Sequence, residues 1–251
     1  MAKLSVFSLT VLAAVVVVTL SHSQEPQTFQ VSVEIKGGYS CTGAVFTVYY
    51  ILTAASCVYN ASASDVLVRT NTVTPGWRGT VHMVREVAIH PDYTPDSLFP
   101  ANIALLKLHK KLHFGNQITP VTLWRRMPHI GSEGFTTGWG TACDQFNEIS
   151  QKAQLKKSFK VPVVIVEPRY CFVINNRTYL SCVSSTTSLS YSPCQTDMGG
   201  LLIIHKKLAG LNLLTINRAF SVFTSISPYI PWIKSAAFRT HSENFFENRN
   251  K

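Results

Sequence analysis

Short apolar or alternating segments recur along this chain, and residues typical of turns separate them. Most segments are rich in valine, isoleucine, threonine and aromatic residues, which favour strands. The expected strands are Phe29–Ile35, Ala44–Leu52, Val66–Arg69, Thr80–Ile89, Ile103–Leu108, Val161–Val166, Leu201–Ile204 and Leu208–Leu213. Turn signals include Gly37-Gly38, Pro75-Gly76 and Gly131-Ser132. This spacing predicts an all-β sandwich or barrel, and a barrel leaves few strand edges exposed.

Length and composition support a folded chain. The 251 residues are 46% hydrophobic and 14% charged, which excludes intrinsic disorder as a description of the whole chain. One large β domain or two domains of ~100 residues each fit this length. Tyr229, Trp232, Ile233 and Ala236 recur at helical spacing, so a helix is expected near the end. The residues after it are polar and are expected to fray.

The first 23 residues are typical of a secretory signal peptide. Lys3 supplies a positive start, Leu4 to Leu20 is mostly apolar, and Ser21 and Ser23 are small residues before a cut at Gln24. The alternative is an uncleaved membrane anchor, for which the apolar run is short because about 20 residues are needed to span. We therefore expect an extracellular protein.

Secretion changes what the cysteines and asparagines indicate. An oxidising compartment favours disulfides, and the absence of a C-x-x-C pair argues against a zinc site. No metal or cofactor is expected. Two sequons, Asn60-Ala61-Ser62 and Asn176-Arg177-Thr178, are candidate glycosylation sites.

Three segments carry the strongest pattern in the chain. Residues 52–57 read L-T-A-A-S-C, residues 102–108 read N-I-A-L-L-K-L, and residues 194–201 read C-Q-T-D-M-G-G-L. In order and spacing they resemble the chymotrypsin/trypsin-like serine proteases, whose segments read L-T-A-A-H-C, D-I-A-L-L-x-L and C-x-G-D-S-G-G-P. Phe29–Val33, Gly138-Trp139-Gly140 and Tyr229…Trp232-Ile233 support the resemblance, which covers about residues 28 to 235.

The resemblance implies two six-stranded antiparallel β-barrels and a C-terminal helix. The expected domain covers residues 24–238, with one barrel at about 28–122, the other at about 129–227, and the helix at about 228–238. Residues Leu123 to Pro128 are a candidate linker, and residues 239–251 form the polar tail.

The catalytic positions implied by the resemblance hold unsuitable side chains. Acyl transfer in this family uses a serine nucleophile, a histidine base and an aspartate that orients the histidine; the family is the general template for these roles. Ser56 stands at the position of the base, Asn102 at that of the carboxylate and Met198 at that of the nucleophile. A thioether cannot form an acyl-enzyme, so we expect no protease activity.

Neighbouring positions are changed as well. Thr196 replaces the glycine of the oxyanion segment, and Ser192 stands at the base of the former specificity pocket, which is expected to be small and apolar or blocked. Asp197 remains although no I-V-G-G-like start lies upstream, so we expect it to be paired otherwise or solvated.

The resemblance also implies disulfides between Cys41 and Cys57 and between Cys171 and Cys182. Cys143 and Cys194 then remain, and we predict a non-standard bridge between them. The alternative is two free thiols, one of them available to a second chain.

The chain is basic, with 23 Lys and Arg against 13 Asp and Glu. Many of its cations are close together in the sequence, in four small groups: Lys107, Lys110 and Lys111; Arg125 and Arg126; Lys156, Lys157 and Lys160; and Lys206 and Lys207. Gathered on one face, they would bind sulfated glycans or acidic proteins; otherwise they are an ordinary solvated surface. No nucleic-acid motif is present.

Together these observations predict a secreted, inactive serine protease homologue that acts by protein binding, as a cofactor, decoy or scaffold. It resembles non-enzymatic insect homologues, which by analogy suggests seminal fluid or haemolymph. Two alternatives are a serine endopeptidase with relocated catalytic residues and a signal-anchored adhesion protein.

Overall fold

The computed structural model describes residues 27–95, 101–139, 158–171, 179–186, 198–216 and 220–247. The predicted signal peptide lies outside these residues, and so do several predicted site residues: Cys143, Asn176, Ser192, Cys194, Thr196 and Asp197. Those predictions therefore stay predictions.

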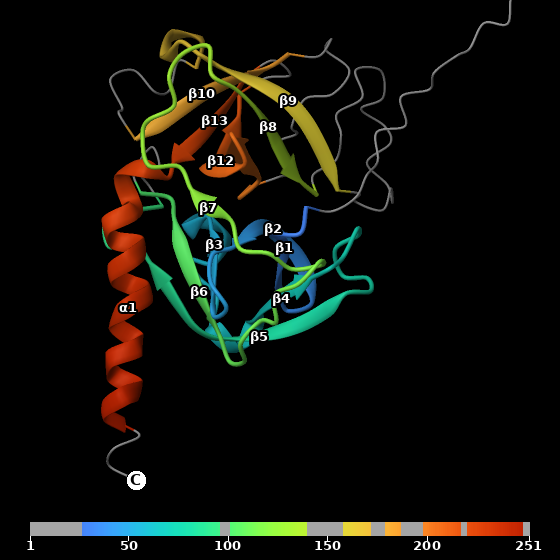
Figure 1. The fold of residues 1–251 in the computed structure, drawn as a ribbon, viewed down its shortest axis with the longest axis vertical. Helices are drawn as coiled ribbons and strands as arrows, with labels where there is room; N and C mark the ends of the chain where they lie inside the picture. Colours follow the sequence, from blue (N-terminus) through green and yellow to red (C-terminus); the bar gives the residue numbers. More distant parts are fainter. Residues whose placement is uncertain are drawn as a thin grey trace, which may run out of the picture.

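Six antiparallel strands in the first half of the chain close into a barrel (Figure 1). They are β1 (Gln30–Ile35), β2 (Gly38–Val45), β3 (Tyr50–Thr53), β4 (Val66–Thr70), β5 (Thr80–Ile89) and β6 (Ala104–Leu108), in the order β1-β2-β3-β6-β5-β4. Inward-facing Val31, Val33, Ile51, Val68 and Leu106 are completely buried in its core. Two 3-10 turns, Ala55–Cys57 and Ala63–Asp65, follow β3.

The second half forms a second barrel. Its strands are β7 (Thr122–Leu123), β8 (Glu133–Gly138), β9 (Phe159–Val166), β10 (Leu180–Ser185), β11 (Leu201–Ile204), β12 (Lys207–Thr215) and β13 (Phe220–Ser225). The pairing of β11 with β12 closes six of them, while β7 adds to β12 in parallel, so the candidate linker begins inside a strand. The predicted all-β fold of two six-stranded barrels is confirmed within the described residues.

The sequence pattern located some strands closely and merged others. Thr80–Ile89 and Leu201–Ile204 have the predicted bounds. The single strand predicted at Ala44–Leu52 is wrong, because the chain turns between Val45 and Tyr50. In that turn the Thr47 hydroxyl accepts hydrogen bonds from the N–H groups of Tyr49 and Tyr50, both at 3.2 Å.

The C-terminal helix is longer than predicted. A 3-10 turn at Ser227–Tyr229 leads into α1 (Ile230–Glu247), whereas the pattern predicted a helix at about 228–238 and a frayed tail from residue 239. The segment after Pro231 contains no glycine or proline up to Glu247, so nothing in its sequence ends the helix earlier. No helix among the described residues has the length and apolar character needed to cross a membrane.

The two barrels share one apolar interface. Leu52 and Leu105 of the first barrel pack in the same cluster as Leu201 and Ile203 of the second, and Ile233 of α1 joins them. All five are buried. Helix α1 runs beside the first barrel (Figure 1), so the chain end ties the two halves together.

Candidate functional site

Ser56 is held by the turn that follows β3. The segment Ala55–Cys57 is a single 3-10 turn, and Ala55 and Cys57 are buried on either side of Ser56. The disulfide between Cys41 and Cys57 joins this turn to β2, with a Cα–Cα separation of 6.0 Å. This confirms the first implied bridge and fixes Ser56 at the end of the first barrel.

Asn102 precedes β6 and is only 1% exposed. Its Oδ1 accepts a hydrogen bond from the Ser56 backbone N–H at 2.8 Å, and its Nδ2 donates to Ser56 Oγ at 3.1 Å. One amide therefore satisfies both polar groups of Ser56, which a carboxylate in the same place would not do in this pattern because it has no proton to donate.

Met198 belongs to a segment that docks between the barrels. Its carbonyl accepts a hydrogen bond from the Thr42 N–H at 3.2 Å, and the Gly199 N–H donates to the Asn212 carbonyl at 2.9 Å. Gly199 has a φ of +75°, and a Cβ at this position would clash with the Thr42 carbonyl oxygen. The glycine is thus required for the close approach that places Met198.

The structure brings the three predicted positions together. Ser56 Oγ lies 3.9 Å from Met198 Sδ, so a chain of contacts runs from Asn102 through Ser56 to Met198. This order of contacts is the one in which an acid, a base and a nucleophile would act. An amide, a hydroxyl and a thioether cannot transfer a proton near neutral pH, and the thioether offers no nucleophile with a proton to lose.

No histidine among the described residues hydrogen-bonds to Ser56 or Met198. His90 packs 5.1 Å from Tyr229 and 4.9 Å from Trp232, measured between ring centroids, and burial lowers its pKa although Asp92 opposes the shift. His82 instead hydrogen-bonds to Thr70 Oγ1. The described residues hold no group of side chains suited to a metal ion.

The segment before Asn102 is fixed from the far end of the chain. The Ala101 N–H donates to the Tyr229 hydroxyl at 3.1 Å, and Ala101 has a φ of +51°. Burial raises the pKa of Tyr229 to about 12, with the Ala101 N–H opposing the shift. The sequence analysis missed this contact, which joins residues far apart in the chain.

A groove of about 500 Å³ opens beside Ser56. Its walls include Tyr59, Tyr93 and Asn60, and the rings of the two tyrosines meet edge to face at 5.5 Å. Burial raises the pKa of Tyr93, and the neighbouring Tyr59 adds to the shift. Asn60 is exposed at the rim, where its predicted glycan would have room.

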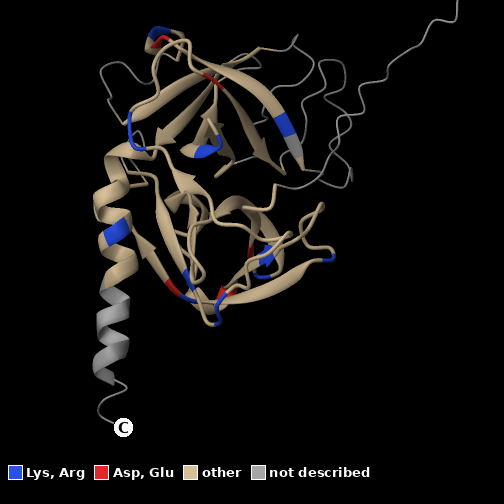
Figure 2. Ribbon diagram, in the orientation of Figure 1, with Lys and Arg blue, Asp and Glu red and all other residues tan. Residues whose placement is uncertain are grey.

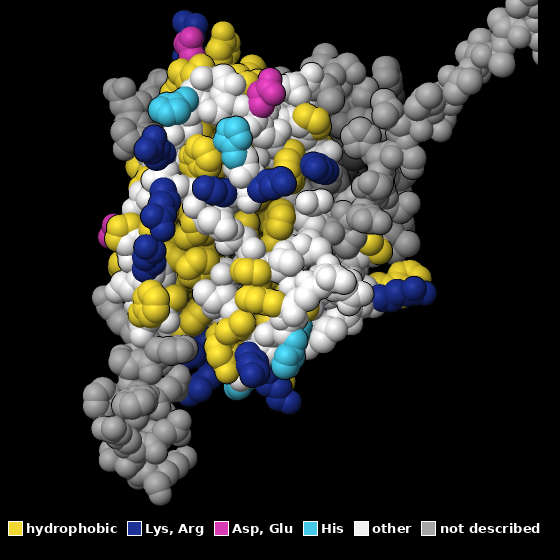
Figure 3. Space-filling view, in the orientation of Figure 1, with side chains coloured by type: hydrophobic (Ala, Val, Ile, Leu, Met, Phe, Trp, Pro, Cys, Tyr) yellow, Lys and Arg dark blue, Asp and Glu magenta, His cyan; other side chains and the backbone are white. Residues whose placement is uncertain are grey.

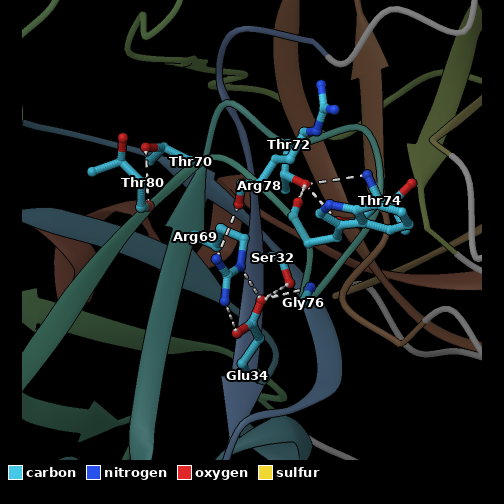
Figure 4. A network of polar contacts seen from close by, with 10 residues as sticks. Ser32, Glu34, Arg69, Thr70, Thr72, Thr74, Gly76, Arg78 and Thr80 are labelled. Atoms are coloured by element: carbon cyan, nitrogen blue, oxygen red, sulfur yellow. Dashed lines mark hydrogen bonds and ion pairs between the residues drawn. The ribbon is translucent and has the colours of Figure 1, made fainter.

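A buried carboxylate, also missed by the sequence analysis, supports a nearby loop. Glu34 is 0% exposed and accepts two hydrogen bonds from Arg69, at 2.7 and 2.9 Å (Figure 4). The Gly76 N–H and the Ser32 hydroxyl also donate to Glu34 Oε1, at 3.0 and 3.2 Å. Arg69 in turn donates to the Arg78 carbonyl, so this network holds the loop between β4 and β5.

The second implied disulfide is also present, between Cys171 and Cys182 with a Cα–Cα separation of 5.8 Å. It joins β10 to the 3-10 turn Pro168–Tyr170. The predicted Cys143–Cys194 bridge, the oxyanion position Thr196 and the pocket position Ser192 lie outside the part of the chain that the structure describes.

Comparison with known proteins shows which family and which fold this chain resembles. The family model described as Trypsin matches residues 17–233. Trypsin alpha of Drosophila erecta is 27% identical over 219 residues, covering 83% of this chain and 82% of the relative. Hypodermin-B of Hypoderma lineatum is 27% identical over 217 residues, with the same two coverages. The solved structure of neuropsin, a serine protease expressed in the limbic system of mouse brain, superposes with a TM-score of 0.70 at 22% identity, covering 84% of this chain and 95% of that one.

Proposed function

Because this chain belongs to the trypsin family, yet has Ser56, Asn102 and Met198 in contact where a catalytic triad would stand, we propose that it is a non-catalytic homologue that acts by binding a protein partner. It serves as a cofactor, decoy or scaffold outside the cell. The named relatives are proteases, so the proposal rests on this chain's own side chains.

The contact of Ser56 with Asn102 and Met198 carries the proposal. In a related catalytic unit, loss of the nucleophile or the base alone lowers turnover by about 10⁶, and further losses add little. Here the same three positions are adjacent and in the same order as in a catalytic unit, so this chain does not differ from an enzyme in where these side chains lie. The difference is chemical, because none of the three groups accepts or donates a proton usefully near pH 7.

The groove beside Ser56 supports a binding role. Tyr59 is 45% exposed and lies on a wall that also contains the Cys57 end of a disulfide-linked turn. Rigid aromatic side chains at the edge of a groove are common anchors in protein interfaces. Lys36 and Asp65 line the same groove and would supply the polar rim.

Two features support an extracellular location. The Cys41–Cys57 and Cys171–Cys182 disulfides are typical of oxidising compartments. The apolar start of the chain, from Leu4 to Leu20, is the proposed signal peptide. Asn60, exposed beside the groove, is a proposed glycan site. By analogy with non-enzymatic insect homologues, we propose that the protein acts in seminal fluid or haemolymph.

A fluorophosphonate probe for serine hydrolases tests the absence of catalysis. The purified natural protein should remain unlabelled, while trypsin alpha of Drosophila erecta at equal concentration is labelled. Labelling of this protein that maps to one side chain and disappears on heat denaturation would mean a relocated nucleophile, and the proposal would be withdrawn.

Peptide selection tests the binding role separately. Phage-displayed peptides selected on the natural protein are measured against Tyr59→Ala and against Tyr170→Ala. Tyr170 is a matched control because it is 44% exposed on the other barrel, compared with 45% for Tyr59. We expect Tyr59→Ala alone to weaken binding, by about tenfold or more. Equal binding to both variants would show that the groove is not the peptide-binding site.

A further inference from the structure

Five cations form a row across one face of the second barrel. We call Arg125, Arg126, Lys160, Lys206 and Lys207 the basic row; all five are exposed. In the space-filling view, Lys and Arg side chains cross the face over this barrel as a band (Figure 3). The ribbon shows their origin in separate segments of the barrel (Figure 2).

Strand pairing explains why the five residues come together. Arg125 and Arg126 follow β7, which pairs with the start of β12 at Lys207. Lys206 lies in the turn between β11 and β12, and β11 pairs with β8. On the next strand, Lys160 pairs with Thr137 of β8. The row therefore crosses five neighbouring strands, roughly 19 Å measured across them at the usual strand spacing. It also runs obliquely along them, because Lys160 is level with Leu201 at the start of β11, whereas Lys207 pairs with Ile204 at its end.

The described residues offer the basic row no acidic partner. The ion pairs found there join Arg69 to Glu34, His90 to Asp92 and Arg169 to Glu167. Glu133 begins β8 two residues before Phe135, which pairs with Ile203 near the turn that carries Lys206, but no ion pair found among the described residues joins Glu133 to a cation of the row. Lys160 Nζ lies 4.1 Å from the centre of the Phe135 ring, which holds its charge over the sheet without neutralising it.

A hollow of about 550 Å³ lies at one end of the basic row. Arg125, Arg126 and Lys207 line it, together with His129 and Trp124. The Trp124 ring stacks on His205, with centroids 5.6 Å apart, and the backbone N–H of Trp124 donates to the Leu208 carbonyl at 2.8 Å. The wall of the hollow is thus fixed by both ring stacking and backbone pairing.

The turn that presents Lys206 adopts a demanding conformation. His205 and Lys206 have φ values of +45° and +61°, as type I′ hairpin turns require at both central positions. Asparagine and glycine usually fill these positions because other residues are strained there. A lysine is present nonetheless, at the point where the basic row crosses from β12 to β11.

We propose that the basic row binds a sulfated polysaccharide, with the hollow holding one sulfated sugar. A linear polyanion matches cations arranged one strand after another, and guanidinium groups at the hollow can each bind two sulfate oxygens. An acidic protein would need a broad, rounded interface, whereas these cations follow a line from β7 to β9. The inference holds whether or not the chain is catalytic.

Heparin affinity tests the proposal with a charge-matched pair of variants. Arg125→Gln/Arg126→Gln/Lys207→Gln removes three charges at the hollow. Arg85→Gln/Lys110→Gln/Lys111→Gln removes three exposed charges from the first barrel, leaving the same net charge. We expect the natural protein to stay on heparin at ~0.15 M salt, and the first variant to lose about 10- to 50-fold in affinity while the second loses less than about threefold.

Two further ligands distinguish the source of the negative charge. Hyaluronan carries carboxylates without sulfate, and phosphatidylserine vesicles present an anionic lipid surface. Weak binding of both supports the sulfated ligand. Equal losses of heparin affinity in the two variants would show that only the overall charge matters and would overturn the proposal. Tighter binding to the vesicles than to heparin would mean that the basic row binds a membrane surface instead. Thermal melting of both variants, expected to match the natural protein, separates binding loss from unfolding.

Discussion

The side-chain amide of Asn102 spans both polar groups of Ser56, accepting from its backbone N–H at 2.8 Å and donating to its hydroxyl at 3.1 Å. Asn102 is almost completely buried. The N–H and hydroxyl of Ser56 and the side-chain amide of Asn102 all have neutral partners, so neither side chain needs a charged neighbour. The position where a protease would keep a buried negative charge is here a structural hydrogen-bonded unit.

Asn102→Ala should therefore destabilise the fold. It removes two hydrogen bonds and leaves the Ser56 N–H without its partner, so we expect the free energy of unfolding to fall by about 2–3 kcal/mol. Ser56→Ala is the matched control, because its backbone N–H still donates to Asn102, and it should cost less than half as much. Chemical denaturation measures both; equal losses would show that the backbone contact contributes little.

Tyr229→Phe tests the contact that holds the segment before Asn102. The variant leaves the buried Ala101 N–H without an acceptor, and we expect a loss of about 1–3 kcal/mol. Tyr93→Phe is a suitable control, since the Tyr93 hydroxyl makes no hydrogen bond within the described residues.

The same variant has a defined alkaline signature. Burial raises the pKa of Tyr229 to about 12, above the value of about 10 in the unfolded chain. The folded state therefore favours the neutral phenol, and this contribution to stability is complete below about pH 10 and lost as pH rises toward 12. The stability difference between the natural protein and Tyr229→Phe should shrink over that window. A constant difference would contradict the assignment.

Glu34→Gln should make the fold less stable and less sensitive to acid. Burial alone would raise the pKa of Glu34, but the hydrogen bonds from Arg69 and the Gly76 N–H outweigh it and lower the pKa. We expect a loss of about 3 kcal/mol at neutral pH, because Arg69 is left without its buried partner.

The pH range in which the natural protein loses this stability follows from the lowered pKa of Glu34. A lowered folded-state pKa gives stability that is present above the unfolded value of about 4.3 and is lost as pH falls through the folded value. The gap between the natural protein and Glu34→Gln should therefore narrow below about pH 4. The exposed Glu133→Gln should leave the curve unchanged; a gap that widens in acid would refute the ion-pair account.

Replacing each of two adjacent lysines by glycine should change the stability of the fold in opposite directions. Lys206→Gly relieves a left-handed residue in the turn and should stabilise the fold by about 0.5–1 kcal/mol. Lys207→Gly removes the same charge from within β12 and should destabilise it by about the same amount, since glycine weakens a strand. Thermal unfolding measures both, and loss of stability in the two variants alike would mean that Lys206 is not strained.

Local patterns were informative where one physical cause dominates. Residues that favour strands, with turn signals on both sides, identified Thr80–Ile89 correctly, although Val84 is its only buried residue. The merged strand at Ala44–Leu52 shows the limit of this reasoning. Both arms of the hairpin are apolar, and the turn between them is held by backbone hydrogen bonds to the Tyr50 carbonyl and by the Thr47 hydroxyl, which no apolar pattern reveals. The helix continued beyond its apolar stripe because no breaker residue ended it.

The sequence by itself determined which side chains occupy positions 56, 102 and 198, and its strand pattern indicated an all-β sandwich or barrel. The two disulfides and the double-barrel architecture were implied by the resemblance of three short segments to a known family. Only the tertiary structure decided that Asn102 satisfies Ser56, that Tyr229 holds Ala101, that Glu34 is buried against Arg69, and that five scattered cations form one row. The physical reason is that hydrogen bonds and charges act through space over a few ångströms, and the closure of the barrels and the packing of the C-terminal helix decide which distant residues come that close.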